Sequence, residues 1–221
     1  MKKQKIIEVK SVTHNVVRLK VEKPNGLEFV PGQAVDFALD RAEWKDELRP
    51  FTFTSLPQDD YLEFTIKVYP ERHGVTEQIG KLKAGDPVLL GDVFGDIQYK
   101  GDGLFIAGGA GVTPFISVFK DLNRKGKLDN SKLLFANKKE EDIIDRKFFK
   151  NILGSNFINI LSQEEVDGME HGYITKELIA NQVEGEGAHF YVCGPPPMME
   201  AVLKELKDLG VPKERIVHEE F

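Results

Sequence analysis

The chain has 221 residues, of which 41% are hydrophobic and 30% charged, and its formal net charge at pH 7 is −6. This length accommodates one large domain or two small ones, and the acidic balance argues against nucleic-acid binding as the main task. No run of about 18 apolar residues and no secretory leader is present, so we expect a cytoplasmic protein without membrane insertion. The single cysteine, Cys193, excludes an internal disulfide and a cysteine-ligated iron-sulfur cluster or zinc site built by this chain alone.

The first half of the chain reads as short strands separated by turn signals. Clusters such as Pro24-Asn25-Gly26 and Ala84-Gly85-Asp86 interrupt runs rich in β-branched and aromatic residues. The predicted strands cover residues 6–12, 16–21, 34–39, 51–55, 61–68 and 87–91. This spacing is typical of an antiparallel barrel or sandwich, and one short helix is predicted over residues 74–82.

Residues 49–55, Arg-Pro-Phe-Thr-Phe-Thr-Ser, form a pattern that suits a flavin nucleotide. Side chains alternate between the faces of a strand, so Arg49 and Phe51 share one face while Pro50 and Thr52 share the other. Arg49 offers a bidentate fork to a pyrophosphate, and Phe51 an apolar surface to the isoalloxazine ring. Thr52, or its backbone N–H, can reach the redox-active nitrogen. The alternative is an amphipathic surface strand after an ordinary surface arginine.

The second half alternates between predicted strands and helices. Strands over residues 103–107, 132–136, 157–161 and 190–193 alternate with helices over 114–125, 143–153, 175–181 and 197–209. Such alternation indicates βαβ units and a parallel sheet. We place the boundary in the turn-rich segment 99–102, which predicts one domain over residues 1–100 and another over 101–221.

A glycine-rich turn, residues 108–114, joins an apolar strand to a helix. Gly109 and Gly111 let the backbone approach a dinucleotide pyrophosphate, and the helix N-terminus supplies free N–H groups. Thr113 and Pro114 open the helix, where the missing N–H of proline costs nothing. The turn carries Gly-x-Gly-x-x-Pro in place of the usual Gly-x-Gly-x-x-Gly, and a tight turn without a ligand is the alternative.

Cys193-Gly194-Pro195 stands where the last predicted long strand meets the last long helix. Ligands of open α/β sheets bind outside the carboxyl ends of the strands, so this segment and the glycine-rich turn can face one ligand. Without a histidine partner Cys193 is a poor nucleophile, and its expected influence on a nicotinamide is steric and electronic. The alternative is a small buried side chain. The five histidines show no metal-ligand spacing, so no metal is expected.

In this order, the clusters resemble the ferredoxin-NADP reductase superfamily of flavoproteins from Val12 to Phe221. Residues 49–52 are similar to its Arg-x-Tyr-Ser/Thr flavin motif, with Phe51 in place of Tyr. Residues 74–76 are similar to its second phosphate turn, 109–114 to its nicotinamide-nucleotide turn and 193–195 to its nicotinamide-side motif. The resemblance implies an FAD-binding β-barrel, then an NAD(P)-binding α/β domain, with hydride passing from nicotinamide to flavin.

The resemblance also implies a role for each matching residue. Arg49 would hold the FAD pyrophosphate and Phe51 would pack on the flavin without the hydroxyl of a Tyr. Thr52 would hydrogen-bond the ring near N5, and Phe221 is a candidate gate over the flavin, unless the chain end is frayed. The remaining implied contacts are the backbone of Ile66 and Lys67 to the flavin, Gly74, Val75 and Thr76 to phosphate, and Gly194 and Pro195 to the nicotinamide nucleotide.

The donor is predicted from residues 135–143, which resemble the stretch of NADH-dependent cytochrome reductases in the superfamily. There an acidic residue at the position of Asp142 disfavours a 2′-phosphate, and the Ser/Arg pair and Tyr of an NADPH-type relative are missing. Lys138 and Lys139 can meet a phosphate or form a solvated charge run. NADH is therefore the expected donor and NADPH the alternative.

The predicted function is an FAD-dependent NAD(P)H oxidoreductase that passes electrons to a separate carrier such as flavodoxin, ferredoxin or a haem protein. Reduction of free flavin is an alternative, and the choice between FAD and FMN rests on the resemblance. A different class of function is a non-catalytic nucleotide-binding module of a larger complex. Such a module predicts loss of the cofactor contacts, whereas Arg49, Thr52, Thr76, Gly111 and Cys193 are all present.

Overall fold

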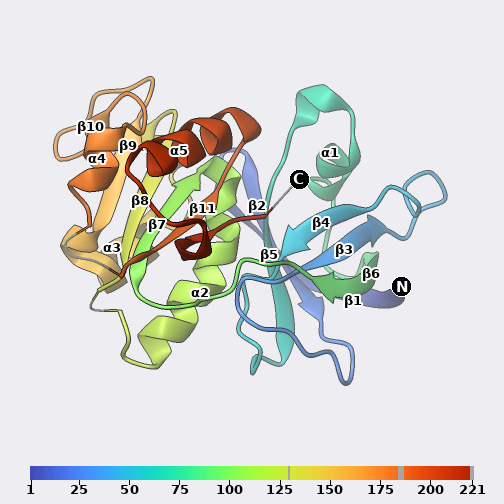
Figure 1. Ribbon diagram of the computed structural model, residues 1–221. Coiled ribbons are helices and arrows are strands. Elements are labelled where there is room, and N and C mark those ends of the chain that lie inside the picture. The colour runs from blue at the N-terminus through green and yellow to red at the C-terminus, as the bar shows by residue number, and fades with distance from the viewer. Residues whose placement is uncertain (129, 184–186, 220–221) are drawn as a thin grey trace.

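The structure, a computed structural model, describes residues 1–128, 130–183 and 187–219. It contains two six-stranded sheets, one from each half of the chain (Figure 1). The proposed boundary between residues 100 and 101 falls in the connection between the last strand of the first sheet and the first strand of the second. Within the described ranges, no helix is long and apolar enough to span a membrane.

The first sheet is antiparallel and follows the order β4-β3-β6-β1-β2-β5. Its strands are β1 (Lys2–Thr13), β2 (Val16–Glu22), β3 (Ala34–Leu39), β4 (Arg49–Thr52), β5 (Tyr61–Lys67) and β6 (Pro87–Phe94). The two edge strands meet through a bridge between Phe53 and Phe64, so the sheet closes on itself. The predicted antiparallel barrel is confirmed, and the sandwich alternative is wrong.

Aromatic side chains on the inner faces of these strands form the barrel core. Phe37, Phe53 and Phe64 are fully buried, and the ring of Phe53 stacks on Phe29 with centroids 4.1 Å apart. Phe51 lies two positions before Phe53 on the same face and meets Phe37 edge-on at 5.5 Å. The aromatic alternation after Arg49 therefore places Phe53 in the core and Phe51 at its margin.

The second sheet is parallel, and its order is β10-β9-β8-β7-β11-β12. Its strands are β7 (Gly103–Gly108), β8 (Lys132–Asn137), β9 (Phe157–Leu161), β10 (Glu170–His171), β11 (His189–Cys193) and β12 (Ile216–Val217). The helices are α2 (Thr113–Arg124), α3 (Arg146–Leu153), α4 (Lys176–Ala180) and α5 (Pro196–Asp208). Apolar residues of α2 and α3 pack on one face of the sheet and those of α4 and α5 on the other. The predicted α/β arrangement is confirmed.

Several elements differ from the expected bounds for local reasons. The helix predicted over 74–82 is α1 (Val75–Ile79), because Gly80 ends it. The helix predicted over 143–153 begins at Arg146, because Asp145 adopts a left-handed backbone (φ 53°). Strand β1 begins at Lys2 because residues 2–5 pair with β6.

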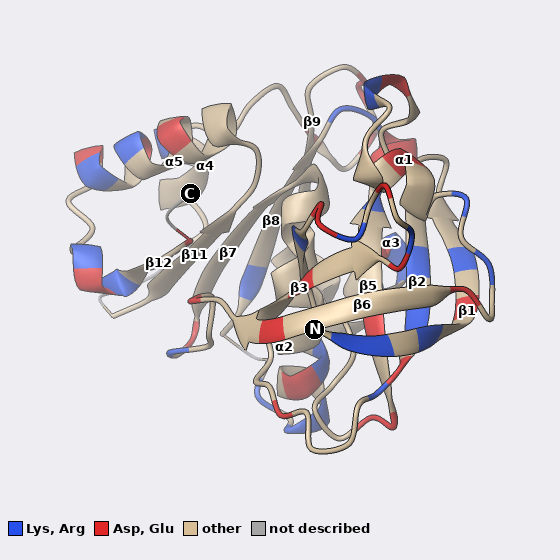
Figure 2. Cartoon of the chain, turned by 90° about the vertical axis from the view of Figure 1, so that its right-hand side faces the viewer, with Lys and Arg blue, Asp and Glu red and all other residues tan. Residues whose placement is uncertain are grey.

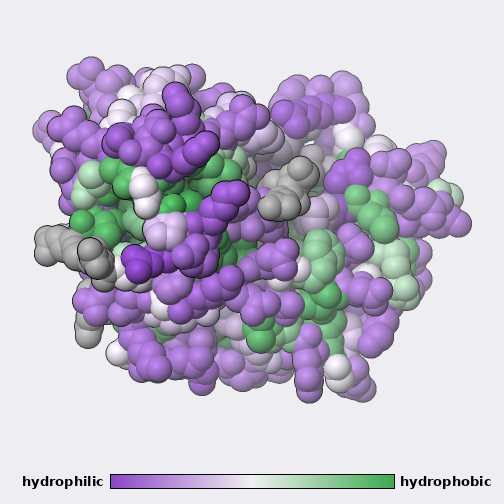
Figure 3. All heavy atoms as spheres, in the orientation of Figure 1, coloured by the Kyte–Doolittle hydropathy of each residue, from purple (hydrophilic) through white to green (hydrophobic). Residues whose placement is uncertain are grey.

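Charge and apolar surface are unevenly distributed. Lys and Arg residues gather on β1 and β2 (Figure 2), although the chain as a whole is acidic. The face in Figure 3 is mostly hydrophilic, with separate apolar areas on each half of the molecule. Among the large apolar residues that are exposed, Leu48 precedes β4 and Tyr173 follows β10.

Candidate active site

A cavity of about 640 Å³ lies at the carboxyl edge of the second sheet. Its walls come from the segments that follow β7, β8, β9 and β11, from the first turns of α5, and from Lys67 and Tyr69 of the first half. Of the predicted site residues, the cavity brings together Lys67, Gly109, Gly111, Asp142, Gly194 and Pro195. Ligand cavities commonly measure about 300–1,000 Å³, so its size suits a dinucleotide.

The two predicted glycines of the turn after β7 have different surroundings. A Cβ on Gly109, which has φ 51°, would meet nothing within 4 Å, so this backbone is bare toward the cavity. A Cβ on Gly111 would lie 2.3 Å from the carbonyl oxygen of Cys193, so only glycine lets the turn pack against the end of β11. The bare backbone and the close approach fit a dinucleotide pyrophosphate.

Thr113 and Pro114 support this turn without lining the cavity. The Thr113 hydroxyl donates to the carbonyl oxygen of Ala110 at 3.0 Å, and Pro114 is buried in the first turn of α2. Neither side chain lines the cavity. Their direct contact with a nucleotide stays a prediction.

Cys193 ends β11, and its thiol is held in the neutral form. Burial raises the pKa of the thiol to about 12, and the nearby carboxylate of Glu219 adds to the shift. A neutral thiol is a weak nucleophile. Cys193 does not line the cavity, and its steric and electronic influence on a ligand stays a prediction. Gly194 and Pro195 carry the chain from this position to α5 along the cavity wall.

The wall after β8 contains a polar atom without a partner. The Nδ2 atom of Asn137 is buried and has no hydrogen-bond acceptor within the described ranges, and Asn137 lines the cavity. Buried polar groups are nearly always paired, so this amide fits a ligand acceptor. The sequence analysis missed Asn137; the available signal was an amide that ends an apolar strand at the carboxyl edge of a parallel sheet.

Asp142 lies farther along the same wall. Its Oδ2 accepts a hydrogen bond from the backbone N–H of Lys139 at 3.1 Å, and its Oδ1 lies 3.7 Å from Nε2 of His14 in the barrel. Lys138 also lines the cavity, whereas Lys139 is exposed and does not. The wall therefore offers a carboxylate and one ammonium group to the part of a nucleotide that binds beyond β8.

The predicted flavin residues on β4 lie at the edge of the barrel. Arg49 is exposed and donates to the carbonyl oxygen of Leu48 at 2.7 Å and to Glu47 at 3.1 Å, both in its own loop. Pro50 is exposed, while Phe51 and Thr52 are half-buried. The Thr52 hydroxyl makes no hydrogen bond to another described residue. The hydroxyl is thus available to a ligand, whereas the guanidinium is paired with Glu47 and would have to release it or use its remaining N–H groups.

The predicted phosphate turn follows β5, in which Ile66 is buried. Gly74 precedes α1 and supplies no side chain to cap it, so the first N–H groups of the helix, at Val75 and Thr76, lack an intrahelical acceptor. Such donors, with the Arg49 guanidinium, form a set that fits the pyrophosphate of FAD. Tyr69, which the sequence analysis missed, links this region to the cavity.

The C-terminal segment returns to the barrel after β12. Phe221, the predicted gate, lies outside the described residues. Glu219 is half-buried, and a Cβ on Gly95 of the barrel would lie 3.1 Å from its Oε1 atom. Burial, with a smaller effect of Asp96, raises the pKa of this carboxyl. The sequence analysis missed Glu219, because nothing near it in the sequence indicates that it contacts the barrel.

Comparison with known families assigns both halves of the chain. Residues 1–86 match the FAD-binding domain family, and residues 105–204 match the oxidoreductase NAD-binding domain family. The chain therefore combines an FAD-binding domain with an NAD-binding oxidoreductase domain. The chain belongs to the ferredoxin reductase-like superfamily, in which an FAD-binding domain is joined to an NAD-binding oxidoreductase domain.

Individual relatives agree with this assignment. The reductase component of propane 2-monooxygenase from Mycolicibacterium goodii is 29% identical over 98% of this chain and 66% of the relative. NADH-cytochrome b5 reductase 2 from Mycosarcoma maydis is 29% identical over 88% of this chain and 62% of the relative. The chain thus spans slightly less than two thirds of the length of these curated relatives.

Solved structures share the fold over nearly the whole chain. The FAD/NAD-binding domain of nitric oxide dioxygenase from Vibrio cholerae matches with a TM-score of 0.85 and 21% identity, covering 100% of this chain and 98% of that one. A ferredoxin NADP+ reductase from Neisseria gonorrhoeae with bound FAD and NADP matches with a TM-score of 0.83 and 20% identity, covering 99% and 97%. The two-domain arrangement is therefore a known one.

Proposed function

We propose that this protein takes a hydride from NADH onto FAD and passes the electrons to a separate protein carrier. The observation that carries the proposal is the position of Lys67 and Tyr69. They stand at the end of the strand that is expected to contact the flavin, and they also line the cavity formed by Gly109, Gly111 and Gly194. A dinucleotide in that cavity therefore reaches the flavin-binding side of the barrel.

The barrel residues would bind and orient FAD, which supplies the redox chemistry: it accepts a hydride and releases the electrons singly or as a pair. Arg49 would neutralise the pyrophosphate, together with the backbone N–H groups of Val75 and Thr76 after Gly74. Phe51 would pack on the ring, and Thr52 with the backbone of Ile66 and Lys67 would fix its polar edge. Pro50 would hold the strand edge between these contacts.

The second domain would hold the dinucleotide. Gly109 and Gly111, at the turn that Thr113 and Pro114 support, would accept the pyrophosphate. Cys193, Gly194 and Pro195 would border the nicotinamide, with a neutral thiol that excludes water without attacking the ring. Asp142 would disfavour a 2′-phosphate, which supports NADH over NADPH, although Lys138 on the same wall favours the opposite choice.

The electron acceptor is proposed from the relatives. Their names include the ferredoxin--NAD(P)+ reductase component of a naphthalene 1,2-dioxygenase system and an NADH-cytochrome b5 reductase. We infer an acceptor of the same kind, an iron-sulfur or haem protein that takes single electrons. One cysteine within these 221 residues cannot ligate an iron-sulfur cluster, so a cluster would lie outside them. A location in the cytosol also stays a prediction.

Purified protein should be yellow, and its flavin absorbance should bleach without oxygen when NADH is added. Because Asp142 would repel a 2′-phosphate, NADPH should bleach it at least tenfold more slowly at equal concentration. An Asp142→Ser variant should narrow this gap, whereas Asp121→Asn, a change on α2 that does not line the cavity, should leave it unchanged. A colourless protein that does not take up FAD would contradict the reductase function, and faster bleaching by NADPH would contradict only the donor choice.

A further inference from the structure

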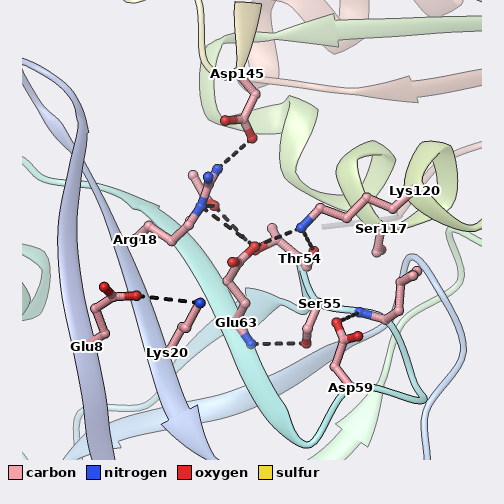
Figure 4. Close-up of polar contacts among 12 residues, drawn as sticks. Glu8, Arg18, Lys20, Thr54, Ser55, Asp59, Glu63, Ser117, Lys120 and Asp145 are labelled. Atoms are coloured by element: carbon pink, nitrogen blue, oxygen red, sulfur yellow. Dashed lines mark hydrogen bonds and ion pairs between the residues drawn. The ribbon is translucent and has the colours of Figure 1, made fainter. Parts of the chain in front are cut away.

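A group of charged and polar side chains, of which Glu63 and Thr54 are buried and the others partly buried, joins the two domains away from the cavity. It consists of Arg18 on β2, Thr54 after β4, Glu63 on β5, Lys120 on α2 and Asp145 before α3 (Figure 4). We call it the Glu63 cluster. Three of its members belong to the barrel and two to the second domain.

Glu63 connects the barrel to α2. Its side chain is 7% exposed, and its Oε1 atom accepts hydrogen bonds from the Thr54 hydroxyl and from Nζ of Lys120, both at 2.9 Å. Lys120 also donates to the carbonyl oxygen of Thr54 at 2.7 Å. Charge-assisted hydrogen bonds are short and directional, so these contacts fix the position of Lys120 against the barrel.

Arg18 connects the barrel to α3. Its Nη2 atom lies 2.5 Å from Oδ2 of Asp145, while its Nε lies 3.6 Å from Oε1 of Glu63. The cluster therefore contains two positive and two negative groups, and the burial of each charge is compensated by an opposite one.

Asp145 pairs with Arg18 of the other domain and does not stabilise its own helix. An aspartate at this position usually caps its own helix, but its side chain makes no cap hydrogen bond to α3. Its backbone is left-handed, with φ 53°, a conformation that is unfavourable for residues other than glycine. The side chain points instead to Arg18 of the other domain (Figure 4).

Helix α2 links the cluster to the dinucleotide site. The helix begins at the glycine-rich turn, and two turns later Lys120 is held by Glu63. Between them, the buried hydroxyl of Ser117 accepts a hydrogen bond from the backbone N–H of Gly32 in the barrel at 3.0 Å. The same helix thus carries the pyrophosphate turn at one end and both contacts to the barrel along its length.

We propose that the Glu63 cluster sets the position of the nicotinamide relative to the flavin by fixing α2 and α3 on the barrel. This inference rests on the proposed function for its catalytic consequence. Hydride transfer requires the reacting atoms to lie about 3–3.5 Å apart, and a misplacement of about 1 Å can lower the rate about a hundredfold. Glu63, Lys120 and Asp145 are accordingly positioning residues, distant from the reacting atoms.

The test compares Asp145→Gly and Glu63→Gln with the control Asp121→Asn. Glycine adopts the left-handed backbone without strain, so Asp145→Gly removes the partner of Arg18 while preserving the turn. Asp121 neighbours Lys120, but its ion pairs with other described residues are with Arg124 and Lys125 of its own helix. If Glu63→Gln does not fold, Asp145→Gly alone decides the outcome.

Two sets of measurements are made on each variant. The first is the rate of flavin bleaching at saturating NADH, together with NADH affinity, bound FAD and melting temperature. The second is hydrogen exchange at the Gly32 amide, which reports on the domain contact without any flavin chemistry. We expect at least a tenfold slower bleaching and a tenfold faster exchange in the two variants, with NADH affinity and FAD content near wild type, and no change in the control.

Bleaching and exchange at wild-type rates in Asp145→Gly would overturn the proposal. Slower bleaching with unchanged exchange at Gly32 would also overturn it, because the effect would then act on the flavin and not on the domain contact. If the wild type itself does not bleach, the proposed function fails, and the exchange at Gly32 still decides whether the cluster fixes the domains.

Discussion

At the scale of single residues, Asn137 is an unexpected member of the site. Its position at the end of β8 is the one from which a side chain reaches the carboxyl edge of the sheet. The Nδ2 atom of this amide is buried without a partner among the described residues, whereas Asp142 on the same wall has its own backbone contact. Asn137 is therefore ready to donate to a bound dinucleotide without first breaking a bond in the protein.

Replacement of Asn137 by alanine should weaken dinucleotide binding about fivefold, since one hydrogen bond contributes about 1 ± 0.5 kcal/mol. The melting temperature should change little, because the amide has no partner to lose. Titration of the protein with NAD+ measures the affinity. Asn159→Ala is the matched control: it removes another buried amide with an unpaired atom, on neighbouring β9, that does not line this cavity. Equal affinities in both variants would contradict the role of Asn137.

At the scale of elements, the glycine-rich turn depends on two glycines for different physical reasons. Gly109 borders open space in the cavity, whereas Gly111 packs on the backbone of Cys193. The missing side chain at Gly109 leaves space for a ligand. At Gly111 it lets the turn pack against the end of β11. Substitutions at the two positions should therefore affect binding and stability separately.

Gly111→Ala should destabilise the fold by about 1–3 kcal/mol, because its Cβ would meet the Cys193 carbonyl oxygen at 2.3 Å. Gly109→Ala should cost about 1–2 kcal/mol for the left-handed backbone alone, and its methyl group would project into the cavity. Urea unfolding of both variants, paired with NAD+ titration, separates the effects. The idea fails if Gly109→Ala binds NAD+ as tightly as wild type, or if Gly111→Ala is as stable as wild type.

The sequence predicted those features that are encoded locally. Alternating and apolar patterns predicted all six barrel strands and the four longer strands of the parallel sheet. Gly109 and Gly111 indicated the turn between a strand and a helix. The two-residue strands β10 and β12 carry too little pattern to be recognised. The helix predicted from residue 143 starts late because Asp145 is drawn to Arg18, a residue 127 positions away. Tyr69 and Glu219 join the site through tertiary contacts that no local motif records, whereas Asn137 had a local signal as the amide that ends an apolar strand.

At the scale of the whole molecule, the two domains are held together at more than one place. The Glu63 cluster and the hydrogen bond from Gly32 to Ser117 join the barrel to the helices on one face of the second sheet. The segment after β12 joins the same domains near the end of β6, where Glu219 approaches Gly95. The cavity lies between domains that are fixed to each other by polar contacts, so its width depends on charge as well as on packing.

Glu219 makes one of these contacts dependent on pH. Its pKa is raised above the ordinary 4.5, mainly by burial and further by Asp96, so the folded chain favours the protonated carboxyl. The stability that this provides is complete below the unfolded pKa and is lost as the pH rises through the folded one. Glu219→Gln should therefore raise the melting temperature at pH 7.5 and leave it unchanged at pH 4. Because the carboxyl is partly exposed, solvent limits the gain in free energy of unfolding to about 1 kcal/mol or less. This corresponds to a rise in melting temperature of about 2–4 °C or less.

Thermal unfolding of Glu219→Gln and wild type at both pH values provides the measurement, and Glu200→Gln on the exposed side of α5 is the control for a general loss of negative charge. The variant should also show a flatter dependence of melting temperature on pH between 4.5 and 7.5. If the gain at pH 7.5 is the same in both variants, it comes from the net charge of −6 and not from this carboxyl. A lower melting temperature of Glu219→Gln at pH 7.5 would mean that the ionised carboxylate stabilises the contact with the barrel, opposite to the direction of its pKa.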